Sequence, residues 1–533
     1  MIGDDMKFLR YLPSIFIALV MVVPTLCVLS FAIGVDGEIW ARLWQTRVPT
    51  LLANSLWLVL TVTIGALFLG TVLAFLVERT DLPIKNIIKP LLIAPLITPC
   101  YIIAICYINF FGMKGLGEKL FNSWGCNINF PNIYGFWGAT AMLTLGTYPY
   151  VFTIVSASLS KMDARFSEAA RCMGIGRVER FFRISIPLLI PAFTAGSILV
   201  ALYVLSDFGV VSLLRHPTFV GTIYEQMSGR YDYSSAASLS TILIGFTLLL
   251  FIGQETLGKR RRYASLKNKS FTAKVVPLGL WKTPAIIFIV LVILMGLIIP
   301  VGVLLYWFIK SFTVSASLQI WATPMKELWR SGMNSLGLSA FVATVTVILA
   351  LPLSYWSVRK PNSISGKCFS WMAQSGIALP GVLTALGLSL VFSRIAPRLS
   401  FSITALFFAF LIHFFAQGFQ MTQAGLKQIS EKLEESARVL GYSKIKTFWF
   451  VTRPLLTPAL LVAWIFVFLS SMRELPASLL LRPAGFDPLT VKVWIAASEG
   501  FYEQAAAPAL LIILLSLPLV IIMSKYSNRY EGN

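Results

Sequence analysis

The sequence has little charge and almost no histidine. Asp, Glu, Lys and Arg make up 13% of its 533 residues, histidine occurs twice, and no connecting segment is long enough to form a separate soluble domain. Hydrophobic residues make up 57% of the chain, which is more than a soluble protein of this length could bury. The composition therefore excludes a soluble globular protein and predicts an integral membrane protein whose main solvent is lipid.

Motifs for disulfides, metals and nucleotides are also missing. The six cysteines show no paired metal spacing, and several lie in apolar runs where cysteine behaves as a small hydrophobe. Residues 361–368 contain Gly366-Lys367 but lack the first glycine and the final serine or threonine of a phosphate-binding loop. We therefore expect neither a disulfide framework nor a cofactor bound by this chain, and any metal ligands stay unassigned.

Apolar runs long enough to cross about 30 Å of hydrocarbon occur twelve times. They lie near residues 11–33, 51–77, 88–110, 134–157, 191–214, 234–253, 283–308, 335–357, 368–393, 401–424, 456–473 and 505–524. The first run is longer than the apolar core of a signal peptide, so we interpret it as a retained span that enters from the cytoplasm. Pro95, Pro99 and Pro380 predict kinks in the third and ninth spans.

The net charge of +21 would suit a nucleic-acid partner, but in a membrane chain the side on which the charges lie decides their meaning. With both termini in the cytoplasm, 30 of the 44 Lys and Arg residues lie inside, whereas the acidic residues divide almost evenly. This positive-inside bias supports the topology, and we expect no nucleic-acid partner. The largest basic cluster, which begins at Lys259, is interpreted as a cytoplasmic linker rather than as a site for lipid headgroups.

One polar motif occurs twice, at an offset of 267 residues (435 minus 168) that is about half of the chain. Each copy has a glutamate and two small residues, then a glycine after three residues and a proline after twelve more. The residues of the two copies are Glu168, Ala169, Ala170, Gly174 and Pro187, and Glu435, Ser436, Ala437, Gly441 and Pro454. Asn54-Ser55 likewise returns as Asn334-Ser335, and Asp207 returns as Glu474.

The repeat predicts two fused halves of six spans each. The halves are residues 1–258 and 283–533, and the basic linker is residues 259–282. Because each half contains an even number of spans, both halves have the same orientation in the membrane. We therefore predict an all-α integral membrane fold with twelve transmembrane helices in two parallel, pseudo-twofold halves.

The repeated motif lies in the inner loops at residues 158–190 and 425–455. Residues 168–173 favour a short helix, Gly174 permits a sharp turn, and a basic, aromatic helix follows and ends near Pro187. Exposed aromatic residues among charges are typical of a surface that docks another protein. The alternative is a loop that lies on lipid headgroups. The fixed distances between Glu, Gly and Pro favour docking, because lipid contact does not require them.

The motif resembles the signature of the membrane permeases of bacterial ATP-binding-cassette (ABC) importers, which reads Glu-Ala-Ala, three residues, Gly, nine residues, Ile, one residue, Leu-Pro. The departures are Ser436 for Ala, Ile186 and Arg453 for Leu, and Val451 for Ile. The resemblance implies a type I permease fold in the bacterial cytoplasmic (inner) membrane and a transport subunit that is not itself an enzyme. It implies as partners two copies of an ABC ATPase subunit, which bind ATP and Mg, and a periplasmic or lipid-anchored substrate-binding protein. The two glycine-containing loops would couple the ATPase to the pore.

Within these permeases the chain resembles the iron(III) import family, with the thiamine permeases close behind. The resemblance is carried by residues 78–83, 378–388, 473–482 and 498–506. It implies ferric iron as the substrate, with thiamine or another small cationic solute as the alternative. A secondary transporter, the alternative of a different class, predicts carboxylates near the bilayer midplane, and the predicted spans contain almost none.

Four residues are candidates for the substrate pathway. Asp207 and Glu474 occupy equivalent positions near the outer ends of two spans, and Tyr231 and Tyr502 follow in outer loops. Carboxylate and phenolate oxygens are hard ligands that suit a hard cation.

The alternative for the two carboxylates is structural. Asp207 could pair with Arg215, Glu474 could pair with Arg473 or Arg482, or both could contact the delivering protein. His413, inside the tenth span, is interpreted as bonded to a neighbouring helix.

Overall fold

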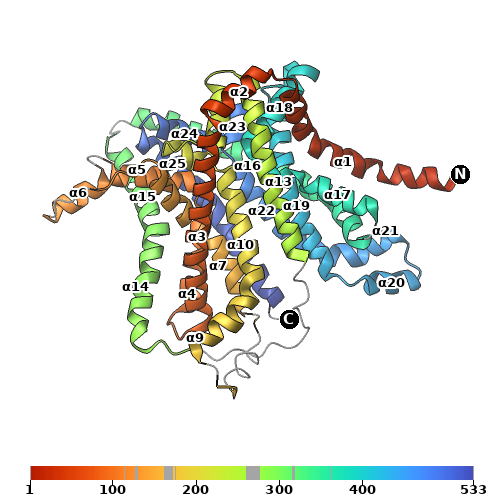
Figure 1. Ribbon diagram of the computed structural model, residues 1–533, viewed down its shortest axis with the longest axis horizontal. Helices are drawn as coiled ribbons and strands as arrows, with labels where there is room; N and C mark the ends of the chain where they lie inside the picture. The colour runs from red at the N-terminus through yellow and green to blue at the C-terminus, as the bar shows by residue number, and fades with distance from the viewer. Residues whose placement is uncertain are drawn as a thin grey trace. The chain divides into compact units, whose positions relative to one another are not determined.

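The computed structural model describes residues 2–112, 115–125, 130–160, 162, 172–174, 176–259, 276–314, 318–361 and 363–531. Every element in this part of the chain is a helix, apart from one isolated bridge between Thr80 and Val276 (Figure 1). Hydrocarbon offers no partner for backbone N–H and C=O groups, so an apolar segment must satisfy them within its own helix. The five described cysteines are free thiols.

The helices up to residue 259 are α1 (Ile2–Ile33), α2 (Gly37–Thr46), α3 (Val48–Arg79), α4 (Lys85–Ile93), η1 (Ala94–Ile97), α5 (Cys100–Phe111), α6 (Leu116–Ser123), α7 (Phe136–Ser160), α9 (Arg177–Arg180), η2 (Phe181–Ser185), α10 (Ile186–Ser206), α11 (Gly209–Leu213), α12 (Phe219–Ser228) and α13 (Tyr233–Lys259). Those that follow are η4 (Gly279–Trp281), α14 (Lys282–Ile293), η5 (Leu294–Ile298), α15 (Ile299–Val314), α16 (Leu318–Arg359), α17 (Ile364–Gln374), η6 (Ser375–Ala378), α18 (Gly381–Ile395), η7 (Pro397–Leu399), α19 (Ile403–Gln428), α20 (Glu431–Val439), α21 (Lys444–Thr447), η8 (Phe448–Thr452), α22 (Arg453–Met472), α23 (Pro476–Leu481), α24 (Leu489–Ser498) and α25 (Tyr502–Glu531).

Among the described residues, nine helices are long and apolar enough to cross a membrane, and a bent pair makes a tenth. The pair is formed by residues 85–97 and 100–111, with an angle of 92° between its parts. The two other predicted spans correspond to the shorter apolar helices Gly381–Ile395 and Tyr502–Pro518. The prediction of a polytopic all-α membrane protein is confirmed, and the number of twelve spans stays a prediction.

Prolines break the third and ninth predicted spans, as expected. Pro99 precedes α5 after the short helix η1, and Pro380 precedes α18 after the short helix η6. At both breaks the proline is the residue before the next helix begins, where a missing N–H leaves no intrahelical hydrogen bond unmade.

The internal repeat is visible element by element. The helices α9, η2, α10 and α11 begin 267 residues before α21, η8, α22 and α23, respectively. The repeated Asn-Ser pair also has one structural role, because its serine hydroxyl accepts a backbone N–H from a later segment of the same half. Ser55 accepts from Phe219 at 3.5 Å, and Ser335 accepts from Leu489 at 2.8 Å.

The chain forms two compact units that interleave in sequence. One unit contains residues 1–42, 222–244 and 311–533, and the other contains residues 43–221 and 245–310. The first span therefore packs on helices of the second half, where α1 contacts α17 and α18. The predicted division into residues 1–258 and 283–533 describes the repeat and stays a prediction.

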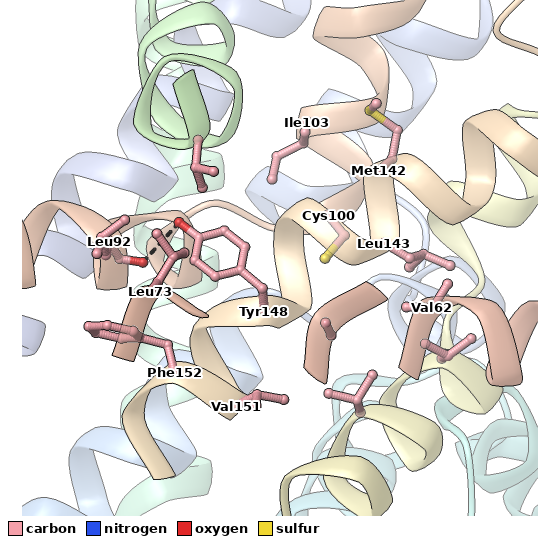
Figure 2. Packing of buried hydrophobic residues seen from close by; sticks show 14 of the residues in the cluster. Val62, Leu73, Leu92, Cys100, Ile103, Met142, Leu143, Tyr148, Val151 and Phe152 are labelled. Carbon is pink, nitrogen blue, oxygen red and sulfur yellow. Dashed lines mark hydrogen bonds between the residues drawn. The ribbon is translucent and has the colours of Figure 1, made fainter. Parts of the chain in front are cut away.

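The unit formed by residues 43–221 and 245–310 has a core between α3, α7 and α10, which lie side by side (Figure 1). Val62, Leu73, Leu143 and Phe152 are among the buried side chains of this core (Figure 2). Tyr148, also fully buried, donates its hydroxyl to the carbonyl oxygen of Leu92 at 3.1 Å. This carbonyl lies in the last turn of α4, where the span breaks, so a side chain supplies the partner that lipid cannot.

Gly387→Leu is expected to destabilise the unit that contains α1 and α18. A Cβ at Gly387 would lie 2.7 Å from both the carbonyl oxygen and the Cβ of Pro24 in α1, and overpacking of this kind costs about 1–3 kcal/mol. The apparent melting temperature of the purified chain measures the effect. Gly302→Leu is the matched control, because no atom lies within 4 Å of a Cβ built there. Equal melting temperatures for the two variants would contradict the packing of α1 on α18.

Candidate functional site

The second polar loop, residues 425–455, is described throughout. After α19 ends at Gln428, α20 forms a short helix, and Gly441 with a φ of +88° turns the chain into α21. This left-handed conformation favours glycine, because a Cβ would crowd the backbone. On α20, Glu435 and Ser436 are exposed and Ala437 is buried.

The first polar loop is described only in part. Glu168, Ala169 and Ala170 lie outside the described residues, and the helix expected over 168–173 stays a prediction. Gly174 is described, and its φ is +78°. The turn predicted at the glycine is therefore present in both copies.

The aromatic helix after each glycine does not end near the proline, contrary to expectation. Residues 182–206 and 444–472 each form one continuous helix that contains Pro187 or Pro454. The π-helices η2 and η8 lie immediately before these prolines. A π-turn shifts the hydrogen-bond register, so the helix can continue past a residue that has no N–H. The Gly441 turn is thus joined to a membrane helix without a break.

Large apolar side chains gather on the exposed surface of the second polar loop. They are Leu433, Val439, Leu440, Ile445, Trp449 and Phe450. Val439 is 88% exposed, although it ends a helix whose other exposed residues are mostly charged. In the first loop, Met173 and Phe182 are exposed at the corresponding places on either side of Gly174. Apolar patches rimmed by charge are typical of protein interaction surfaces.

One buried carboxylate fixes α20 to its own half. The side chain of Glu434 is 5% exposed and accepts hydrogen bonds from three donors on two other elements. Arg359 Nη2 donates at 2.7 Å and Tyr355 donates its hydroxyl at 2.9 Å, both from α16, and Thr452 of η8 donates its hydroxyl at 2.9 Å. Arg359 Nη1 also donates to the carbonyl oxygen of Ile429 at 3.2 Å. Glu434 therefore joins the end of α16, the helix α20 and the π-turn before α22.

The charge on Glu434 is favoured by these donors. Burial alone would raise the pKa of this carboxyl, but the hydrogen bonds from Arg359, Tyr355 and Thr452 outweigh burial and lower the pKa below its ordinary value. Glu434 is therefore a charged, fully bonded group in the folded chain at neutral pH.

Asp207 and Glu474, the repeated carboxylates, occupy the same local position. Asp207 ends α10 and accepts the backbone N–H of Val210 in α11 at 2.9 Å. Glu474 follows α22 and accepts the backbone N–H of Ala477 in α23 at 3.3 Å. Each carboxylate thus faces the positive end of the short helix that follows a span.

Glu474 lies against the start of α18 in the broken ninth span. A Cβ at Gly381, the first residue of α18, would lie 2.1 Å from Glu474 Oε1, so a larger residue there would displace the end of the glutamate side chain. His413 Nε2 is 3.8 Å from Glu474 Oε2. His413 Nδ1 lies 2.8 Å from the carbonyl oxygen of Leu379 and must donate, because a carbonyl only accepts. His413 is therefore bonded to a neighbouring segment, as expected.

Two of the arginines that the sequence offers as partners of these carboxylates make other contacts. Arg215 lies over the ring of Tyr134, with 5.4 Å from Cζ to the ring centroid. Arg482 pairs with Asp487. Asp207 and Glu474 also cap short helices, a role that the sequence did not predict.

Of the other candidate pathway residues, Tyr231 lies in a loop and Tyr502 in a helix. Tyr231 has a φ of +54° and is 73% exposed, and Tyr502 begins α25. Tyr231, Glu474 and Tyr502 belong to one compact unit and Asp207 to the other. Among the described residues no group of three or more His, Cys, Asp or Glu side chains could hold a metal ion.

The helical membrane fold, the internal repeat and the paired glycine turns define a class: a polytopic permease with two equivalent polar loops. Residues 66–313 and 347–529 match the family described as binding-protein-dependent transport system inner membrane component. This chain belongs to that family. It is a multi-pass inner-membrane transport subunit.

Several curated proteins are similar to this chain. The Fe(3+)-transport system permease protein FbpB 2 of Haemophilus influenzae is 30% identical over 505 residues, which cover 91% of this chain and 92% of the relative. The ferric transport system permease protein FbpB of Actinobacillus pleuropneumoniae is 25% identical over 91% of this chain and 73% of its own length. The molybdenum transport system permease protein ModB of Escherichia coli is 26% identical over 227 residues, which are 95% of that protein but 41% of this chain. A complete relative thus corresponds to less than half of this chain, as expected for a fused repeat.

Glu434→Gln is expected to lower stability at neutral pH but not in acid. The folded state lowers the pKa of Glu434, so the stability that its charge contributes is present above about pH 4.3 and is lost as the pH falls through the folded pKa. At neutral pH the loss is about 1–3 kcal/mol, because Arg359 keeps its charge without its carboxylate.

Thermal unfolding of the wild type and the variant at neutral pH and at a series of pH values falling to about 3 checks this expectation. Glu431→Gln is the control, since its carboxylate lies 3.7 Å from the same arginine but is 57% exposed. A gap between the wild type and Glu434→Gln that stays constant into acid would contradict the pKa direction.

Proposed function

We propose that this chain is the translocating subunit of an ATP-driven, binding-protein-dependent importer for ferric iron. The observation that carries the proposal is the polar loop around α20, which presents an exposed apolar surface and is joined to a membrane helix without a break. Iron is supported by the relatives, because the two ferric permeases named above are similar over 91% of this chain.

The proposed fold has twelve spans in two parallel halves. Ten of these spans are the nine long apolar helices and the bent pair. The other two are the broken ninth span, from α17 to α18, and α25, whose apolar part covers Tyr502–Pro518. The positive-inside bias places both termini and both polar loops in the cytoplasm. This orientation puts the exposed apolar patches where an ATPase could reach them.

The proposed partners are two ABC ATPase subunits and one substrate-binding protein. One ATPase subunit would dock on each polar loop, through Glu168, Ala169, Ala170, Gly174 and Pro187 in the first copy and Glu435, Ser436, Ala437, Gly441 and Pro454 in the second. ATP and Mg would be bound by these subunits, and the chain itself would hydrolyse nothing. The substrate-binding protein, periplasmic or lipid-anchored, would deliver iron on the outer face.

The structure offers a mechanical route from the second docking surface to the membrane. A displacement of α20 passes through the Gly441 turn to residues 444–472, which form one continuous helix. The far end of this helix carries Glu474 and the cap of α23. A rigid helix transmits a displacement along its length, so ATP-driven closure at α20 would move the segment around Glu474. Asp207 and Glu474, with Tyr231 and Tyr502, are proposed to line the path of the cation.

Replacing Gly174 and Gly441 together with leucine is expected to uncouple transport from ATP. Both glycines have positive φ and open space around a built Cβ, so the strain comes from the backbone alone and costs about 1–3 kcal/mol at each turn. In proteoliposomes with the ATPase subunits and iron-loaded binding protein, the wild type should accumulate iron only with ATP, and the variant should not.

The control for this experiment is Gly245→Leu with Gly302→Leu, two glycines with equally open space and without positive φ. Normal iron uptake and normal ATPase binding by the double turn variant would overturn the docking role. Uptake of thiamine in place of iron would assign the substrate to the alternative, and uptake driven by an ion gradient without ATP would favour a secondary transporter.

The pair Asp207→Asn and Glu474→Gln is expected to abolish most iron uptake while sparing ATPase binding. Amide oxygens still accept the backbone N–H groups of Val210 and Ala477, so the helix caps remain, but the charge that attracts a cation is lost. Iron uptake in the same proteoliposomes measures the effect, and Glu499→Gln, an exposed acid of α24's C-terminal end, is the control. Wild-type uptake by the amide pair would assign the carboxylates to capping alone.

A further inference from the structure

A single buried side chain holds the second polar loop to the membrane helices. The second loop is fixed by Glu434, whose two oxygens are occupied by Arg359, Tyr355 and Thr452. The carboxylate is buried and lies one residue before the repeated motif.

Two offsets relate the halves. Residues of α16 correspond to α3 at an offset of 280, set by Asn334 and Asn54, and the polar loops correspond at an offset of 267. The counterpart of Arg359 is Arg79, and the counterpart of Ile429 is Met162. Arg79 Nη2 donates to the carbonyl oxygen of Met162 at 3.3 Å, as Arg359 Nη1 donates to that of Ile429 at 3.2 Å. One contact of the arginine is therefore the same in both halves, which confirms the correspondence of these positions.

The remaining members differ in chemistry. Tyr355 corresponds to Phe75, Glu434 to Ser167 and Thr452 to Ser185. Phenylalanine has no hydroxyl to donate, and serine carries no charge at neutral pH and has one oxygen rather than two. Arg79 instead donates to a second carbonyl oxygen, that of Leu159, at 2.7 Å. The first half therefore has the arginine and a hydroxyl, at Ser185, but has neither an acid at the position of Glu434 nor a phenol at the position of Tyr355.

The difference matters because of where Glu434 lies. Its partners come from the end of α16 and from the π-turn η8, so one carboxylate links the membrane helix before the loop to the one after it. A buried, charge-assisted network has one geometry that satisfies all its members, and breaking it leaves charge buried without a partner. Hydrogen bonds from an arginine to carbonyl oxygens of a neighbouring segment hold that segment but do not hold the loop helix itself.

We propose that the buried Glu434–Arg359–Tyr355–Thr452 network clamps α20 to the second half, and that the first half, with Phe75 and Ser167 at the corresponding positions, lacks the acid and the phenol that make this clamp, so that the two loops follow their halves with unequal rigidity. Glu434 is a positioning residue in this scheme, since its side chain is buried against α16 and η8. The inference rests on the proposed function only for its consequence, that the second ATPase contact transmits motion more directly than the first.

Hydrogen–deuterium exchange on the full chain in lipid nanodiscs tests the clamp without any partner. Glu434→Gln should speed exchange of the backbone amides of residues 431–441 by about tenfold or more, because local opening no longer requires breaking a charged network. Glu431→Gln, on the same helix and beside the same arginine, should leave exchange within about twofold of the wild type. Ser167→Ala should have as small an effect on the first loop. Unchanged exchange in α19 shows that the Glu434→Gln chain is folded.

Two further variants test the unit and its asymmetry. Arg359→Gln combined with Glu434→Gln should loosen α20 no more than Glu434→Gln alone, because residues of one network do not contribute additively. Ser167→Glu combined with Phe75→Tyr should slow exchange in the first loop by restoring the missing acid and phenol. The inference is overturned if Glu434→Gln exchanges like Glu431→Gln, or if Ser167→Ala loosens its loop as much as Glu434→Gln loosens the other.

Transport measurements separate this inference from the proposed function. In the reconstituted complex, Glu434→Gln should reduce the iron moved per ATP hydrolysed by at least about threefold, while ATP hydrolysis itself continues. If α20 exchanges faster but the amount of iron moved per ATP hydrolysed is unchanged, the clamp is supported and its role in coupling is excluded. An absence of ATP-driven uptake in the wild type would defeat the proposed function and leave the exchange result standing.

Discussion

Hydrocarbon cannot satisfy a backbone N–H or C=O group, and the fold depends on this constraint. Unbroken spans meet it within their own helices, but the third and ninth predicted spans are interrupted by proline and leave carbonyl oxygens to be bonded from outside. In each case a side chain from a neighbouring helix supplies the donor. Tyr148 of α7 bonds Leu92, and His413 of α19 bonds Leu379. These two buried polar residues are therefore part of the backbone structure of the broken spans.

At these breaks the two halves place the small residue of the helix contact on different helices. In the first half, Cys100 begins α5 and faces Gly146 of α7, where a Cβ would lie 2.2 Å from the sulfur. In the second half, Gly381 begins α18, and the counterpart of Gly146 is His413 of α19. The glycine therefore lies on the later helix of the contact in the first half and on the broken span in the second half. As a consequence the first half has a thiol at the break, and the second has space that admits the carboxylate of Glu474.

The sequence predicted those features that depend on local chemistry. Apolar runs predicted the helices, Pro99 and Pro380 predicted the breaks, and Gly174 and Gly441 predicted the turns, since each of these effects is exerted by the residue itself. The role of Glu434 could not be predicted in this way, because two of its three partners lie 75 and 79 residues away along the chain. The correspondence of Arg79 with Arg359 was the one available signal. The caps at Asp207 and Glu474 were missed for a related reason, as the short helices that they cap are too short to give a hydrophobic period.

Burial of Glu434 also explains the form of the repeated motif in the second half. Successive residues of a helix point about 100° apart, whereas residues three apart share a face. With Glu434 and Ala437 turned toward the protein, Glu435 and Ser436 must point outward, as observed. Ser436 replaces the alanine of the permease signature at an exposed position, where the added hydroxyl bonds the carbonyl oxygen of Lys432 at 2.8 Å and meets no packed neighbour that it could displace. Ala437, by contrast, is 7% exposed, so a larger side chain there would push α20 away from the helices that hold it. The residue before the motif thus determines which residues of the motif are free to meet a partner.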